Sequence, residues 1–253
     1  MTEKQWTAFV EYREWLKGKC QEWMAFAGEL YPLQKAASQN DTPEYPLETA
    51  VVYNRAYDEV QPQDEIKLIV IGDNPGKDEQ LAKNNRYLVG QSGKVAEGFF
   101  RKNKELNVDF RKNVIIMNKT PVHTAKTKHL KYLCKNGSDE IKNLIAQSQE
   151  LMAQKAAELH QKLIEGKKKG DKNPELWIVG YSELKGKKIF SKYRDTLRQS
   201  YSEKYWENVY LYHHFSMNRF LVDLKEYLKK QDLPIEQALS EIGIQHRKEI
   251  YGE

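Results

Sequence analysis

Neutral hydrogen-bonding side chains follow several short apolar runs of this chain, and their types could recognise a ligand. Asn74 lies within Gly72-Asp73-Asn74-Pro75-Gly76 after the first run, and Asn118 begins Asn118-Lys119-Thr120-Pro121 after the second. His213 and His214 follow the fourth. Amides and imidazoles present hydrogen-bond donors and acceptors without a permanent charge. Their convergence, if the fold brings it about, predicts recognition of a neutral polar ring.

The elements that must position these residues follow from the apolar pattern. Strands are predicted at residues 66–71, 113–117, 176–179 and 208–212, each nearly continuous in apolar residues, as in strands buried on both faces. Helices are predicted at residues 3–30, 94–104, 138–165, 182–200, 217–230 and 234–244. This alternation predicts an α/β fold, three-layer α/β/α with a four-stranded parallel sheet. Ligands of such sheets bind beyond the carboxyl ends of the strands.

Composition narrows the class of protein. At 40% hydrophobic and 30% charged residues, the chain is typical of a folded globular protein rather than a disordered or membrane protein. We expect one domain over residues 1–253, in which residues 1–62 form a helical lead-in. The charged N-terminus lacks the apolar stretch of a signal peptide, so we expect a cytoplasmic protein with no membrane partner.

Metal and cofactor motifs are not evident in the sequence. Cys20 and Cys134 are too few for a disulfide framework or a four-thiolate cluster, and no CxxC, HExxH or Walker pattern occurs. The expectation is therefore a protein with no cofactor and no metal. The net charge of +5 is compatible with contact to DNA phosphates, and equally with a solvated lysine-rich surface. Basic residues gather at residues 101–104, 111–112, 126–135 and 167–169.

The motifs at the strand ends resemble those of the uracil-DNA glycosylase superfamily. Gly72-Asp73-Asn74-Pro75-Gly76 is similar to the Gly-Met-Asn-Pro-Gly of the single-strand-selective monofunctional branch, and Asn118-Lys119-Thr120-Pro121 to its Asn-x-Cys-Pro. Tyr45-Pro46-Leu47 resembles that branch's lead-in to the first strand. The segment at His213 and His214 resembles the superfamily's His-Pro-Ser motif. The resemblance spans about Tyr45 to Arg219, with unmatched stretches between motifs.

A second branch, the iron–sulfur family 4 enzymes, is also echoed. Its Gly-Glu-Ala-Pro-Gly-x-Asp-Glu and Arg-Pro-Phe-Val-Gly strings resemble residues 72–79 and 86–90. That branch needs four cluster cysteines, which this chain does not have.

The resemblance implies a DNA glycosylase that flips a nucleotide out of the stack and hydrolyses the N-glycosidic bond of uracil or a related deaminated base. Asn118, together with Gly72, would bind the base, since one side-chain amide can satisfy both N3–H and O4 of uracil. Asn74 would orient the attacking water. Asp73 would either help to orient that water or brace the turn. The partner would be single- or double-stranded DNA, bound by a monomer.

Three further roles are open in the sequence. The donor to uracil O2 is His213 by counting back from Asn218 and Arg219, which we favour, and His214 by the local His-x-Ser string. The residue that stacks on the base is Tyr87 by counting from Asn74, or Leu88 by the local string. The superfamily has Phe there, so substrate identity is in doubt. Ser216, Met217, Asn218 and Arg219 would form the DNA-binding wedge loop, or would simply begin a helix.

Two other functions compete with a glycosylase. His214-Phe215 stands where the superfamily has Pro-Ser, and such divergence is compatible with a catalytically silent nucleic-acid-binding member. A third hypothesis is a hydrolase of a small phosphorylated or nucleoside substrate. The chain lacks a phosphate-binding glycine-rich loop with lysine, which argues against this third function.

Overall fold

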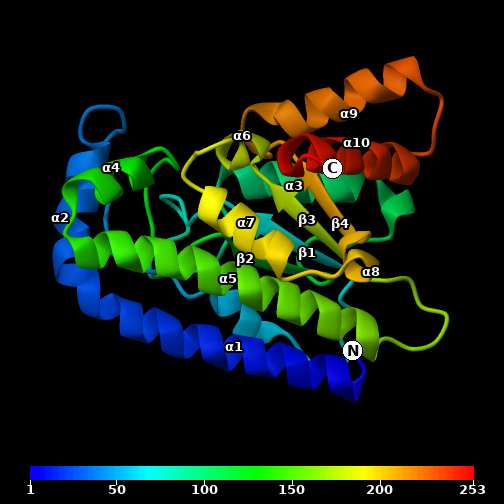
Figure 1. Ribbon diagram of the computed structural model, residues 1–253, viewed down its shortest axis with the longest axis horizontal. Helices are drawn as coiled ribbons and strands as arrows, with labels where there is room; N and C mark the ends of the chain where they lie inside the picture. The colour runs from blue at the N-terminus through cyan, green and yellow to red at the C-terminus, as the bar shows by residue number, and fades with distance from the viewer.

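The protein is built around a four-stranded parallel sheet (Figure 1). The computed structural model describes residues 1–253, except for the side chain of Met217. The strands are β1 (Leu68–Gly72), β2 (Val114–Asn118), β3 (Glu175–Val179) and β4 (Val209–Tyr212). They lie in the order β2-β1-β3-β4, and every neighbouring pair is parallel. The predicted fold class is confirmed, and each strand lies within two residues of its predicted start.

Each face of the sheet has its own apolar core, because alternate strand residues point to opposite faces. Ile69 and Ile71 of β1 pack in a core with side chains of helices α1 (Glu3–Trp23), α5 (Asp139–Gly166) and α7 (Ser191–Gln199). Leu68 and Val70 pack in the other core with α3 (Gln91–Lys102), α9 (Arg219–Lys230) and α10 (Ile235–Tyr251). Helices therefore cover both faces, with α1 and α5 on one side and α9 and α10 on the other (Figure 1).

The helices differ from the prediction where the chain turns. The first predicted helix is divided into α1, a 3-10 turn η1 (Met24–Phe26) and α2 (Ala27–Ser38), and Pro32 lies inside α2. The helix predicted at residues 182–200 is two helices, α6 (Tyr181–Leu184) and α7. The remaining elements are short or were not predicted: η2 (Arg55–Glu59), η3 (Lys104–Leu106), α4 (His129–Asn136), α8 (Glu203–Trp206) and η4 (Ser216–Asn218).

The strand order sets the location of a site. From β1 the chain first crosses to β2 at one edge and later returns to β3 and β4 on the other side, so the direction of winding reverses between β1 and β3. At such a reversal, the loops beyond the carboxyl ends of the two strands diverge and leave a crevice. Within the described part of the chain, no helix combines the length and apolar character that a bilayer crossing requires.

We predict that the first turn of α3 tolerates no side chain at Gly93. A Cβ built there would lie 1.5 Å from the carbonyl oxygen of Leu88, whereas a Cβ on Gly98 of the same helix meets nothing within 4 Å. Gly93→Ala should lower the free energy of unfolding by about 2 kcal/mol or more. Gly98→Ala should raise it by about 0.5–1 kcal/mol, because alanine is the better helix former. Urea unfolding of both variants measures this, and equal stabilities would contradict the assignment.

Candidate functional site

A buried ion pair joins the carboxyl ends of three strands. Lys119, directly after β2, is fully buried, and its Nζ lies 2.6 Å from Oδ1 of Asp73, directly after β1. The same ammonium donates to the carbonyl oxygen of Val179 at the end of β3, also at 2.6 Å. The second Asp73 oxygen accepts a bond of 3.2 Å from the hydroxyl of Thr127. Lys119 therefore occupies the reversal point between β1 and β3.

Neighbouring residues constrain both the charge of the Asp73–Lys119 pair and the space around it. Burial lowers the pKa of Lys119, and the neighbouring Asp73 carboxylate opposes that shift. The Lys119 ammonium also lies 5.1 Å from the centre of the Phe190 ring, a cation–π distance. Gly180, after β3, has φ of 108°, and a Cβ there would lie 2.3 Å from Asp73 Oδ1. Both carboxylate oxygens of Asp73 are therefore engaged by protein groups.

His214 lies in the field of this pair. Burial lowers the pKa of His214, and the charges of Asp73 and Lys119 act on it in opposite directions. The backbone N–H of Ser216 donates to its Nδ1 at 3.1 Å, and the Ser216 hydroxyl lies 2.8 Å from the same nitrogen. A nitrogen that accepts from a backbone N–H carries no proton, so the neutral ring holds its proton on Nε2. His214 is thus a neutral imidazole that presents an Nε2–H donor.

His213 belongs to different surroundings. Its ring stacks on Tyr181 with centroids 4.8 Å apart, and its Nε2 lies 3.5 Å from Oδ2 of Asp223. Burial is the main cause that lowers its pKa, and the charges acting on it are those of Asp223, His246, Arg219 and Glu249. The two consecutive histidines therefore have different surroundings, and the charges of Asp73 and Lys119 act on His214 rather than on the favoured His213.

Asn74 is held by its amide nitrogen. Nδ2 donates to the hydroxyl of Thr124 at 2.8 Å, to the carbonyl oxygen of Val122 at 3.3 Å and to that of Pro75 at 3.3 Å. Two of these acceptors are backbone carbonyls, so they fix which side of the amide carries the NH₂ group. Among the described residues, no donor bonds to Oδ1. That oxygen is the group with which Asn74 could accept a hydrogen bond from a water molecule.

Buried polar groups brace the backbone next to this amide. His123, fully buried, donates from Nδ1 to the carbonyl of Pro75 at 2.8 Å and accepts at Nε2 from the Tyr45 hydroxyl at 2.9 Å. Burial lowers the pKa of His123 to about 4, so the ring is neutral near pH 7. Gln34 donates to the carbonyls of both Ala50 and His123. A buried histidine one residue before Thr124 has no sequence signal that separates it from a surface one.

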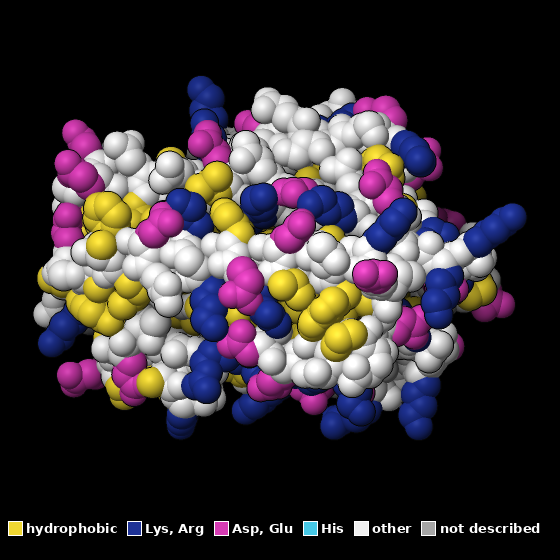
Figure 2. All heavy atoms as spheres, turned by 90° about the horizontal axis from the view of Figure 1, so that it is seen from below, with side chains coloured by type: hydrophobic (Ala, Val, Ile, Leu, Met, Phe, Trp, Pro, Cys, Tyr) yellow, Lys and Arg dark blue, Asp and Glu magenta, His cyan; other side chains and the backbone are white. Residues whose placement is uncertain are grey.

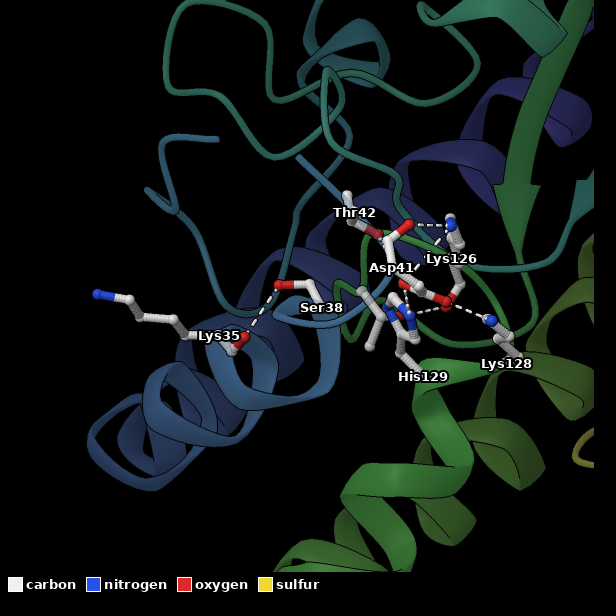
Figure 3. A network of polar contacts seen from close by, with 8 residues as sticks. Lys35, Ser38, Asp41, Thr42, Lys126, Lys128 and His129 are labelled. Atoms are coloured by element: carbon white, nitrogen blue, oxygen red, sulfur yellow. Dashed lines mark hydrogen bonds and ion pairs between the residues drawn. The ribbon is translucent and has the colours of Figure 1, made fainter. Parts of the chain in front are cut away.

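A network of polar contacts around Asp41 holds residues 126–129, which follow Thr124 (Figure 3). The carboxylate of Asp41, just after α2, accepts from His129 Nε2 at 2.9 Å and pairs with Lys126 and Lys128. Bonding to Lys128 is the largest cause that lowers the pKa of Asp41. Two lysines of the predicted basic cluster at residues 126–135 are thus partly neutralised by Asp41 rather than free to bind phosphate.

Asn118, the predicted base-binding amide, lies beside Gly72 across the β1–β2 ladder. It is 2% exposed, and its Oδ1 lies 2.4 Å from the place where a Gly72 side chain would begin. Its Nδ2 is buried and has no hydrogen-bond partner among the described residues. An unpaired buried amide donor is costly, which marks Asn118 as a group that gains from an external acceptor.

The two candidates for stacking on a base are buried. Tyr87 is fully buried and donates its hydroxyl to the carbonyl of Val52 at 2.6 Å, so its ring offers no open face. Leu88 is 3% exposed and adopts a left-handed backbone with φ of 50°. Its carbonyl accepts a bond from Arg111 at 2.8 Å. Both residues hold the loop after β1 in place.

The predicted wedge segment connects β4 to α9. Ser216 and Asn218 bound the short helix η4, and exposed Arg219 begins α9. Asn218 is exposed and has a left-handed backbone with φ of 56°. The side chain of Met217 lies outside the described residues. Ser216 contacts the site directly through His214.

Surface charge does not single out a nucleic-acid face on the side covered by α1. Figure 2 shows basic and acidic side chains interspersed there, with apolar patches between them. Two large hollows also lie away from the strand-end motifs. One of about 750 Å³ lies at the opposite edge of the sheet, near Lys67 and Pro174, and one of about 860 Å³ lies beside α2, near Tyr31 and Tyr45.

Comparisons with protein-family models, with curated proteins and with solved structures find no match to this chain. The structure shows an α/β protein with a four-stranded parallel sheet. Because no relative suggests a function, the function has to be inferred from the geometry of the site.

We predict strong coupling between Asp73 and Lys119. Each single change, Asp73→Asn or Lys119→Met, should cost about 3–5 kcal/mol of unfolding free energy, because it leaves the other charge buried without its partner. The double variant should cost less than the sum of the two by at least about 1 kcal/mol. Urea unfolding of the four proteins measures this coupling, and strictly additive losses would show that the pair does not interact.

We also predict a pH dependence of stability from Glu79, which follows the first motif. This carboxyl is 7% exposed, and burial raises its pKa to about 7 although the backbone N–H of Gly76 bonds to it. The unfolded chain releases this proton near pH 4.5, whereas the folded chain keeps it until about pH 7. The protonated Glu79 therefore contributes fully to the free energy of unfolding below pH 4.5, and this contribution is lost as the pH rises towards 7.

Between pH 5 and pH 8, the wild-type chain should lose about 2–3 kcal/mol of unfolding free energy relative to Glu79→Gln, which cannot ionise. The comparison cancels the titration of other groups. A difference between the two proteins that stays constant with pH would contradict the raised pKa.

Proposed function

We propose that this chain is a DNA glycosylase that hydrolyses the N-glycosidic bond of uracil or a related deaminated base, in base-excision repair. The observation that carries the proposal is His214, a neutral imidazole with its proton on Nε2, on which the charges of the buried Asp73–Lys119 pair act. Cleavage leaves negative charge on the departing base. A preorganised donor and a nearby cation in a water-poor site would stabilise that charge. The two unpaired cysteines suit the reducing cytoplasm.

Two amides complete the proposed roles. Asn118 Nδ2, which lacks a protein partner, would donate to uracil O4, while its Oδ1 would accept from N3–H. Because Asn118 is 2% exposed, the flipped base reaches it only after neighbouring side chains move aside. Asn74, held through Nδ2, would accept from the attacking water with Oδ1 and so direct it towards the sugar. Asp73 and Lys119 would hold the strand ends that carry these groups.

A second function is favoured by one observation. Neither Tyr87 nor Leu88 offers an exposed face against which a base could stack. A protein that binds nucleic acid without cleaving it needs no exposed face on which a base stacks. A catalytically silent nucleic-acid-binding protein is therefore the rival proposal.

The test is cleavage of uracil-containing single- and double-stranded oligonucleotides, detected as abasic sites. We expect Asn74→Ala and His214→Ala each to lower the single-turnover rate by about a hundredfold, which is the scale for loss of one positioned group. Asn136→Ala on α4, which removes an exposed amide bonded only to Tyr132, is the matched control and should retain the rate. Thr124→Val should lower the rate more than Thr124→Ser, which keeps the hydroxyl that holds Asn74.

Salt-sensitive binding without abasic sites, across several deaminated bases, would favour the silent binding protein. Equal losses in Asn136→Ala and Asn74→Ala would remove the proposed role of Asn74.

A further inference from the structure

Three potential metal ligands from separate segments meet beside the site. His213 directly follows β4, Asp223 lies on α9, and His246 lies on α10. One ligand atom from each residue lies within 4.8 Å of the other two, and His213 Nε2 lies 3.5 Å from Asp223 Oδ2. Two imidazoles and a carboxylate form a donor set that divalent transition ions bind, zinc among them.

Two of these groups have buried atoms that the protein leaves unpaired. Oδ2 of Asp223 and Nδ1 of His246 are both buried, and neither has a hydrogen-bond partner among the described residues. Buried polar atoms are nearly always satisfied, because each unpaired one costs free energy. Two such atoms in one cluster call for a ligand that both can bind.

The surrounding elements hold the three side chains in place. Tyr181 of α6 packs on both imidazoles, with centroids 4.8 Å from His213 and 5.2 Å from His246, and its hydroxyl donates to Glu249 at 2.8 Å. Arg247, next to His246, donates to the backbone carbonyls of Trp206 and Val209, which fixes α10 against the start of β4. The cluster is therefore built by docking of helices rather than by chance proximity on a mobile surface.

We propose that His213, Asp223 and His246 form a binding site for a divalent transition-metal ion such as Zn²⁺. Around an ion with bonds of about 2.0–2.2 Å, ligand atoms lie roughly 3–3.5 Å apart. The His213–Asp223 separation already meets this spacing, and a small rotation of His246 supplies the third ligand. The hollow between these residues has no room for an organic molecule, which leaves a single ion as the ligand to test.

The charges that face the site agree with a cation. Asp223 supplies a carboxylate, and Glu249 adds a second acidic group nearby, whereas Arg219 at the start of α9 is the opposing cation. The site does not depend on the proposed glycosylase activity. It would, however, fix His213, and with it the backbone that carries His214.

The test is metal binding by the full chain after dialysis against a chelator. Titration with Co²⁺, followed by visible absorption and by displacement with Zn²⁺, should show one ion per chain with nitrogen and oxygen ligands. Asp223→Asn and His246→Ala should each weaken binding by at least about a hundredfold, since loss of outer-sphere partners alone costs 10–100-fold. Asp232→Asn, an exposed aspartate in the loop after α9, is the matched control and should leave affinity unchanged.

Anomalous diffraction from Zn²⁺-soaked wild-type crystals provides a measurement that does not depend on the variants folding. A peak between His213, Asp223 and His246 supports the proposal. It is overturned by a wild-type chain that takes up no ion, by affinity unchanged in both variants, or by an anomalous peak elsewhere. Uracil excision is measured separately, so failure of either proposal leaves the other testable.

Discussion

The contact on which the candidate site depends most is the buried ion pair between Asp73 and Lys119. A fully buried ammonium is costly to desolvate, and it is tolerated here because a carboxylate and a strand-end carbonyl both accept from it at 2.6 Å. Its partners follow β1 and end β3, whereas Lys119 itself follows β2. The pair thus cross-links three strands at the reversal point, where an open parallel sheet would otherwise leave a crevice.

Around this pair, neutral groups hold the loop that carries Asn74. His123 links Tyr45 to the backbone of Pro75, and Thr124 holds the amide of Asn74. The effect is to leave the amide oxygen of Asn74 with no donor among the described residues, in a loop whose other polar groups are bonded. Polar groups that the protein already holds in position need little rearrangement when a ligand binds. A site that stabilises charge through hydrogen bonds depends on this property.

The sequence was sufficient for the sheet but not for the roles within the site. The four strands could be predicted because runs such as residues 68–71 are apolar without interruption and lie between polar turns. The break between α6 and α7 was missed because the apolar residues Ile189 and Phe190 continue the pattern across Lys185–Lys188. Strand-end placement of Asn74, Asn118 and the histidines follows from the strands alone.

Long-range partners account for what could not be predicted. Lys119 was read as one position of a motif, yet its burial depends on Asp73, 46 residues earlier, and on Val179, 60 residues later. The cluster of His213, Asp223 and His246 has no local spacing that a motif would capture, because it forms only when α9 and α10 dock beside β4. Tyr87 matched the stacking position by counting, but its hydroxyl is bonded to Val52 within the core.

The end of β4 shows how one strand can serve two sites. Beyond the last residue of β4, His213 lies against Asp223 of α9 and His246 of α10, whereas the charges of Asp73 and Lys119 act on His214. If His214 is the motif histidine, then Phe215 stands where the superfamily has proline, and Ser216 keeps its place. Phe215 is fully buried and packs on Phe220 with centroids 5.0 Å apart. A buried aromatic anchor can restrain this turn as a proline ring would, while Ser216 sets the tautomer of His214. Under the proposed function, Phe215 and Ser216 would thus hold and orient the His214 donor without the proline of the superfamily.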